Sequence, residues 1–278
     1  MLEILHKISV ACFFTSYLLA YALELSRLVV SFGARSAIVL VMMALGLFTQ
    51  ISFLFLRVID VPVDEKLGLL SSWAEWSLLL ALGLAIFFTV AYIRRSDTII
   101  SLFFLPLILL TIGLGVFVGG WERFSRDHAT DVWGSIHGFA MMVGTGSVLI
   151  GFLAGVMYLV QSRRLKMKRA GGTRFRLPTL ETLDRANRQS LLVSTISVAI
   201  GTIAGMIMNL NENYRMVWSD SGIILSLVLL VWLCVAAATE FFYRPASRGR
   251  KAFYMTLASL GFLLLALFGV VFSSHGVS

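Results

Sequence analysis

Charged residues are scarce in this chain of 278 residues. Only 14% of the residues are charged and 58% are hydrophobic, with a mean hydropathy of +0.88. Soluble domains carry about 25% charged residues, so this composition excludes a water-soluble globular protein. The alternating pattern of an outer-membrane barrel is also lacking, and the apolar runs are long enough for helices to cross about 30 Å of hydrocarbon. The predicted fold class is an all-α, polytopic integral membrane helix bundle.

Cysteine and proline are rare as well. The two cysteines, Cys12 and Cys234, are isolated in apolar surroundings, there is no CxxC or CxxCH motif, and we interpret both as packing residues. Four prolines contrast with 23 glycines, which lie mostly inside apolar runs and permit close helix packing. Small-xxx-small spacings occur at Gly151/Gly155 and Gly201/Gly205. The chain lacks a charged start followed by a cleavage site, so we expect the first apolar segment to be retained as a membrane anchor.

Eight apolar runs bounded by charge predict about eight transmembrane helices. They lie near residues 8–24, 36–56, 70–92, 99–119, 132–160, 189–209, 222–243 and 252–273. The connections at 25–35, 93–98, 161–188 and 244–251 hold 17 Lys and Arg residues, against 6 in the termini and the other connections. The positive-inside rule therefore makes these four connections cytoplasmic and both termini extracytoplasmic.

The connection at 161–188 is predicted to be a basic cytoplasmic loop. It follows a span directly and lacks interleaved aromatic residues, which favours contact with lipid head groups over binding of nucleic acid. Within it, Leu177 to Arg188 has helical spacing and a Thr179/Thr182 start before acidic residues. This pattern predicts a short interfacial helix that leads into the sixth span.

All four histidines fall on the extracytoplasmic side in this topology: His6, His128, His137 and His275. His137 lies about 7 Å inside the fifth span at 1.5 Å per residue. An ionisable group there is costly and indicates a function, although position alone equally allows a neutral histidine that donates to a backbone carbonyl of a neighbouring helix. His275 directly follows the eighth span, where a solvated tail histidine is the alternative.

The outward connection between the sixth and seventh spans, NLNENYRMVWSDSG, is polar and aromatic. Two imidazoles at one leaflet would suit a metalloporphyrin, since iron takes axial histidine nitrogens, Trp218 can stack on the macrocycle, and Arg57 or Arg215 can pair with propionates. The same region could hold a divalent metal through histidine, Asp220 and Glu75. Composition and spacing leave both alternatives open.

Several stretches occur in an order that is typical of one family. WGSIHGFAMMVGTGSVLIGFLAGVMYLVQSRRLK resembles a segment in which a histidine opens a span that ends in a basic loop. RLPTLETLDRANRQSLLVSTISVAIGTIAG is similar to an LPSLExLDxLxxR motif followed by a helix ending in GxxxG, and LFGVVFSSHG is similar to a final histidine near the end of the last span. QISFLFLR and LLSSWAEWSLLL resemble an early HxxxxxxR motif and an LxSxxEW-like piece. The chain thus resembles the cytochrome c assembly proteins, haem-handling membrane proteins of the CcsA/HemX-like type.

This resemblance implies a single transmembrane domain over residues 1–278 that binds haem b transiently. His137 and His275 would be the axial ligands of the haem iron, and the other implied contacts are Trp218, Asp220, Arg57 and Arg215. The implied function is an accessory in cytochrome c maturation that presents or delivers haem at the outer face to other maturation proteins of a bacterial inner (plasma) membrane. It would be no enzyme itself, and at most a non-catalytic subunit of a cytochrome c synthetase system.

The chain departs from the family pattern at two places. The tryptophan-rich signature WGxxWxWD is reduced to Trp218, Ser219 and Asp220, and Gln50 stands where the family carries a membrane-embedded histidine. An amide is a poor ligand for haem iron, so we expect no second haem site at Gln50. These departures resemble the HemX-like branch, whose members look like accessory or regulatory proteins of haem metabolism.

Two other functions remain open from the residues. Glycine-rich spans and the polar residues Gln50 and Asn209 are compatible with a transporter accessory for a small solute or metal ion, although the two halves show no inverted repeat. A non-binding regulatory scaffold could instead dock a partner through the basic loop. The chain lacks a nucleophile elbow, an HExxH motif and paired carboxylates at a span, which argues against a hydrolytic enzyme.

Overall fold

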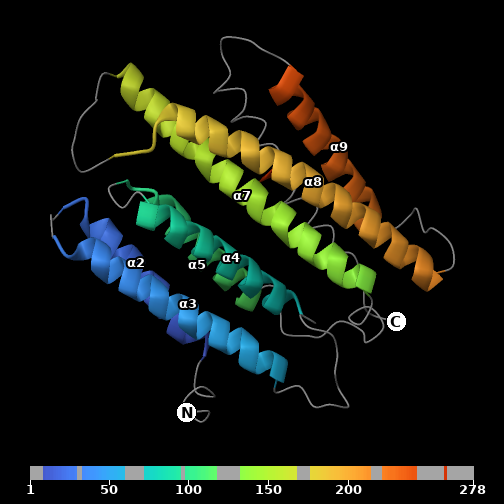
Figure 1. Cartoon of the computed structure of the whole chain (residues 1–278), viewed down its shortest axis with the longest axis horizontal. Coiled ribbons are helices and arrows are strands. Elements are labelled where there is room, and N and C mark those ends of the chain that lie inside the picture. Colours follow the sequence, from blue (N-terminus) through green and yellow to red (C-terminus); the bar gives the residue numbers. More distant parts are fainter. Residues whose placement is uncertain are drawn as a thin grey trace. The chain divides into compact units, whose positions relative to one another are not determined.

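The computed structural model describes residues 9–29, 33–59, 72–94, 98–117, 132–167, 176–213, 221–242 and 260–261. The elements in these ranges are helices, which confirms the predicted all-α fold class. They are α2 (Val10–Ser26), α3 (Arg35–Ile59), α4 (Trp73–Arg94), α5 (Ser101–Phe117), α7 (Val132–Lys166), α8 (Leu180–Asn213) and α9 (Ser221–Phe242) (Figure 1).

Seven of the eight predicted spans correspond to a described helix. Five helices, α3, α4, α7, α8 and α9, are long and apolar enough to cross a membrane, and α2 and α5 are apolar helices of 17 residues each. A helix of that length spans about 25 Å, near the lower limit for a crossing. The eighth predicted span, 252–273, lies outside the described residues except for Leu260 and Gly261, which are helical. The protein is therefore a polytopic helical membrane protein.

Hydroxyl groups inside the spans bond back to their own helix. Thr49, Thr89 and Thr111 each donate from Oγ1 to the carbonyl oxygen four residues earlier, over 2.7 to 2.8 Å. Hydrocarbon offers no other partner for a hydroxyl, so these bonds allow threonine to be accommodated in a membrane helix at little cost.

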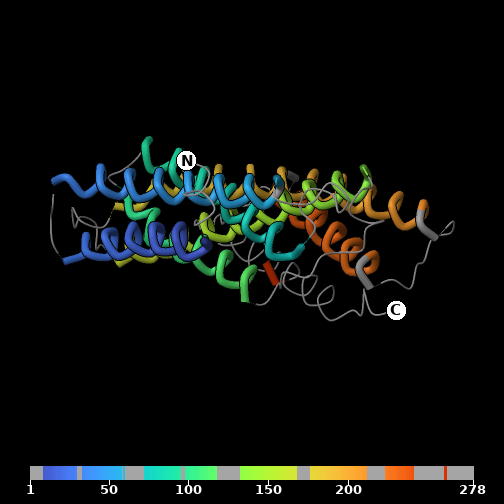
Figure 2. Tube along the Cα trace, turned by 90° about the horizontal axis from the view of Figure 1, so that it is seen from below, coloured from blue at the N-terminus to red at the C-terminus, as the bar shows by residue number. Residues whose placement is uncertain are grey.

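The chain forms two compact units, which we describe separately. Unit 1 comprises residues 1–124 and 171–178 and contains α2, α3, α4 and α5. In this unit α2 and α3 form an antiparallel pair (Figure 2), α4 packs against α3, and α5 packs against α2 and α4. Unit 2 comprises residues 125–170 and 179–278 and contains α7, α8 and α9.

Glu24 lies at the end of unit 1 that is predicted to be cytoplasmic, where it bonds to two other helices. Its side chain is fully buried and accepts hydrogen bonds from the hydroxyls of Tyr92 at 2.7 Å and Ser101 at 2.6 Å. Nη1 of Arg27 lies 3.7 Å from the same carboxylate and donates to the carbonyl oxygen of Thr98 at 3.1 Å. These contacts tie α2 to α4 and α5.

Residues 176–178 lie within the predicted basic loop 161–188 and belong to unit 1. The backbone N–H of Ile99 donates to the carbonyl oxygen of Arg176 at 2.9 Å, and Leu177 and Pro178 are buried. This segment is therefore anchored next to the start of α5. The end of the predicted loop is helical, because α8 begins at Leu180. The beginning of the loop is also helical, because α7 continues through the basic residues to Lys166.

Helix α8 begins where the sequence predicts but does not form a separate interfacial helix. Oγ1 of Thr179 accepts a hydrogen bond from the N–H of Thr182 at 3.3 Å, as an N-terminal cap does. The predicted short helix is instead the first part of one long helix, which runs from Leu180 to Asn213. No glycine or proline interrupts residues 180–200, and the buried face that starts at Leu183 continues through Leu191. Both features favour a continuous helix.

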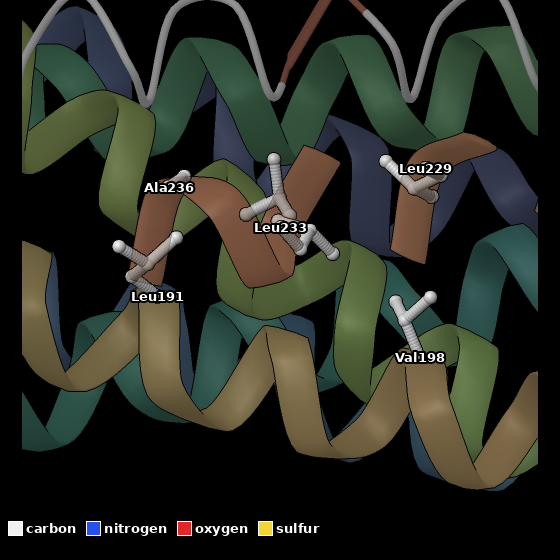
Figure 3. Close-up of a cluster of buried hydrophobic side chains, with 6 residues drawn as sticks. Leu191, Val198, Leu229, Leu233 and Ala236 are labelled. Carbon is white, nitrogen blue, oxygen red and sulfur yellow. The ribbon is translucent and has the colours of Figure 1, made fainter. Parts of the chain in front are cut away.

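Unit 2 packs α7, α8 and α9 around an apolar cluster. The buried members are Val148 of α7, Leu191 and Val198 of α8, and Leu229, Leu233 and Ala236 of α9. Figure 3 shows the side chains of α8 and α9 facing one another in this cluster. Leu260, a residue of the eighth predicted span, is partly buried and packs against the same cluster.

Candidate functional site

His137 lies in the second turn of α7, on the face that packs against α8. The seam between these two helices is built on glycine. Val198 of α8 lies against Gly144, and Met141 and His137 of α7 lie against Gly201 and Gly205 of α8. Because these glycines carry no side chain, the helix axes approach closely and the imidazole lies directly against the backbone of α8.

The hydrogen bond of His137 defines the protonation of its ring. Nδ1 lies 2.7 Å from the carbonyl oxygen of Gly201. A carbonyl oxygen can only accept a hydrogen bond, so Nδ1 is protonated and is the donor. In the neutral ring the lone pair is then on Nε2, the nitrogen that remains for a further interaction. This contact is the one that the structural alternative predicts, a neutral histidine that donates to a backbone carbonyl of a neighbouring helix, and it leaves Nε2 outside the bond.

An apolar groove of about 520 Å³ lies on one flank of the same seam. It follows the half of α7 that carries His137. Its lining residues are Val132, Ser135, Ile136, Phe139, Ala140 and Val143 of α7 and Ser197 and Ile200 of α8. Such a surface can accept a lipid chain or the apolar part of a larger ligand.

Two of the six predicted haem contacts lie within the described residues. His137 belongs to unit 2, and Arg57 belongs to unit 1, at the end of α3. Nε of Arg57 lies 2.9 Å from Oε1 of Glu75 in the first turn of α4, so this guanidinium takes part in an ion pair. The four other predicted contacts lie outside the described residues: His275, Trp218, Asp220 and Arg215.

The alternative of a divalent metal site receives no support from the described helices. Within residues 9–29, 33–59, 72–94, 98–117, 132–167, 176–213, 221–242 and 260–261, no group of three or more His, Cys, Asp or Glu side chains could hold a metal ion. Glu75, which the sequence offered as a ligand, is paired with Arg57. Asp220 lies outside the described residues.

The sequence did not identify how His137 is positioned. From the sequence, the spacing of Gly201 and Gly205 predicts only close helix packing. The structure shows that one of them supplies the carbonyl that His137 binds and that the other gives the ring its space. Two glycines four residues apart, in the span that follows the histidine-bearing span, are the signal that could have found this contact.

Comparison with known proteins identifies the family. The family model described as cytochrome C assembly protein matches residues 70–278, which include α4, α5, α7, α8 and α9. Comparison with curated proteins and with solved structures gave no significant match. The matched region covers well over half of the chain and includes His137 with both glycines that contact it. The chain therefore belongs to the cytochrome c assembly protein family, and its role lies in cytochrome c maturation.

Proposed function

We propose that this protein is a haem-binding accessory of cytochrome c maturation and that His137 is an axial ligand of the haem iron. The observation that carries the proposal is the 2.7 Å hydrogen bond from Nδ1 of His137 to the carbonyl oxygen of Gly201. Metal-ligating histidines almost always donate their other ring N–H to a carbonyl, a carboxylate or water. Nε2 would then be the nitrogen that binds haem iron.

The surroundings of His137 fit a haem group chemically. The imidazole supplies a nitrogen ligand, and the groove on the flank of the α7–α8 seam, which His137 itself does not line, supplies apolar surface. Haem, when bound, supplies an iron centre that accepts axial imidazole nitrogens and a ring with two acidic propionates. In the proposal His275 is the second axial ligand, Trp218 stacks on the ring, Arg215 pairs with a propionate, and Asp220 completes the set.

The proposed role is presentation or delivery of haem at the outer face of a bacterial inner membrane. The chain would act without catalysis of its own, as proteins of the HemX-like type are expected to do. Covalent attachment of haem to a cytochrome would belong to other maturation proteins in the same membrane. The weakness of the tryptophan signature, which keeps only Trp218 before Ser219 and Asp220, supports an accessory rather than a complete synthetase subunit.

The test is the absorption spectrum of the detergent-purified protein. We expect a Soret band of bis-histidine character after expression or after titration with haemin, and its loss or strong weakening in His137→Ala. His6→Ala and His128→Ala are matched controls, because they remove histidines of the same predicted side that carry no motif, and both should keep the wild-type spectrum.

Two outcomes would overturn the proposal. One is a folded, colourless protein that takes up no haemin, which would favour a scaffold that docks partners without binding haem. The other is an unchanged Soret band in His137→Ala, which would place any bound haem on other residues.

A further inference from the structure

Gly144, Gly201 and Gly205 each lie against a side chain of the facing helix in the seam between α7 and α8, and at Gly205 that side chain is the imidazole of His137. A Cβ atom added at Gly205 would lie 2.7 Å from Nδ1 and 3.0 Å from Cε1 of His137. At Gly201 it would lie 2.9 Å from Cγ and Sδ of Met141, a flexible side chain that can move aside. At Gly144 it would lie 2.8 Å from Cγ2 of Val198, away from the histidine.

The ring of His137 cannot move away from Gly205 without losing its hydrogen bond. The atom that a Cβ would crowd is Nδ1, and Nδ1 is also the atom that donates to the carbonyl of Gly201 at 2.7 Å. Imidazole has only two side-chain torsions, so a rotation that relieves the crowding also shifts Nδ1 relative to its acceptor. Any side chain at position 205 therefore forces either the loss of this bond or a separation of the two helices.

We propose that Gly205 is a positioning residue that holds His137 in one ring orientation and one tautomer, with Nε2 prepared to bind haem iron. This inference rests on the proposed function and deepens it. Gly201 contributes the acceptor and Gly205 contributes the space, so the two glycines act together through His137. The GxxxG spacing of α8 then positions the His137 ring in addition to permitting close helix packing.

The orientation of His137 affects how strongly Nε2 can bind a metal. An N–H donated to a carbonyl raises the basicity of the opposite ring nitrogen and fixes the plane of the ring, and loss of such a partner typically lowers metal affinity about 10- to 100-fold. Gly205→Ala should therefore weaken haem binding by at least about tenfold, even though position 205 would not touch haem.

The experiment compares Gly205→Ala with Gly144→Ala in the full-length protein. Both variants add one methyl group to the same seam at nearly the same distance from a neighbouring atom, 2.7 Å and 2.8 Å. Haemin titration should show the loss of affinity in Gly205→Ala only, together with a shifted Soret maximum, while Gly144→Ala keeps the wild-type affinity. Equal losses in both variants, or wild-type binding by a folded Gly205→Ala, would contradict a positioning role.

A readout without haem separates this inference from the proposed function. Nitrogen NMR of ¹⁵N-histidine-labelled protein, with His137→Ala identifying the signal, should show the tautomer protonated at Nδ1 in the wild type and a mixture of tautomers in Gly205→Ala. If the wild type binds no haem, the proposed function fails, and the NMR comparison still decides whether Gly205 orients His137. Identical tautomers in both proteins would overturn the inference.

A second variant covers the case in which Gly205→Ala does not fold. If the added methyl group clashes with the imidazole, removing the imidazole should relieve the clash. The double variant His137→Ala/Gly205→Ala should then regain the folded yield and melting temperature of His137→Ala. A double variant as unstable as Gly205→Ala would show that position 205 acts on packing alone and would refute the inference.

Discussion

The hydroxyl of Tyr17 donates a hydrogen bond to Oε1 of Gln50 at 2.7 Å, deep inside unit 1. The other end of the amide is also engaged, since Nε2 of Gln50 donates to the carbonyl oxygen of Leu78 at 2.9 Å. Gly46 lets the Tyr17 ring pass closely over α3, where a Cβ would collide with the ring. Gln50 thus joins α2, α3 and α4, and both ends of its side chain are used within the protein.

Removing either side chain of this pair should destabilise unit 1. Tyr17→Phe leaves the amide oxygen without its donor, and Gln50→Leu leaves a buried hydroxyl unsatisfied, so we expect a loss of about 1 to 2 kcal/mol for each. The double variant should lose less than the sum, because the two changes remove one shared bond. Thermal unfolding in detergent measures this, with Thr49→Val as the control because its hydroxyl bonds only within its own helix.

Haem content of the Gln50→Leu protein tests a separate expectation. The sequence predicts no haem ligation at Gln50, and the two hydrogen bonds of its amide are consistent with a structural role. Haem bound per folded chain should therefore equal that of the wild type. A fall in stoichiometry would reveal a site that includes this amide.

Glu24 should contribute far more to stability than an exposed acidic residue. Removing the buried carboxylate takes the acceptor from the hydroxyls of Tyr92 and Ser101 and the ion-pair partner from Arg27, so we expect Glu24→Ala to cost about 3 to 5 kcal/mol. Glu181→Ala breaks an exposed ion pair with Arg185 and should change stability by no more than about 0.5 kcal/mol. Unfolding midpoints of the two variants compare them directly, and similar values would show that the Glu24 network carries little stabilisation.

The helices could be predicted because hydrophobic length is a local property. Apolar runs bounded by charge located α3 and α9 within three residues at each end, and the Thr179/Thr182 pattern located the start of α8. The continuity of α8 could not be predicted in the same way. The composition changes from polar to apolar near residue 189, which resembles the boundary of a helix. Backbone hydrogen bonds of a helix form with either kind of side chain, and the buried residues Leu183 and Leu191 lie on both sides of this change, so the helix continues through it.

The candidate site could be predicted only in part, because its decisive contacts join residues far apart in the chain. An ionisable residue inside an apolar run marked His137, since its cost in hydrocarbon is visible in the sequence. Its acceptor is a backbone carbonyl 64 residues later, and the Gly201/Gly205 spacing indicates close helix packing without identifying which group bonds to His137. Glu24 was missed for a related reason: at the end of a predicted span it looks like a solvated boundary charge, and only the packing of α4 and α5 makes it buried.

The ion pair of Arg57 and Glu75 provides a test of the predicted propionate contact. Oε1 of Glu75 accepts from Nε of Arg57 at 2.9 Å, and the Arg57 side chain is 35% exposed. Because solvent screens this pair, we expect a coupling energy of no more than about 1 kcal/mol from a double-variant cycle of Arg57→Gln and Glu75→Gln. If Arg57 also pairs with a propionate, Arg57→Gln lowers haem affinity and Glu75→Gln does not. Equal haem affinity in both variants would leave Arg57 a purely structural residue.

The orientation of the helices in the membrane decides on which side His137 lies. The predicted orientation rests on the distribution of Lys and Arg, 17 in one set of connections against 6 in the termini and the other connections. A variant lacking Cys12 and Cys234 permits single cysteines to be placed at Ser125, in the connection before α7, and at Lys168, after α7. A membrane-impermeant maleimide applied to intact spheroplasts should label Ser125→Cys, and it should label Lys168→Cys only after the membrane is opened. The reverse pattern would place the start of α7 on the cytoplasmic side. Presentation of haem by His137 at the outer face would then be excluded, although its hydrogen bond to Gly201 and its contact with Gly205 would be unaffected, because those depend on the packing of α7 and α8 alone.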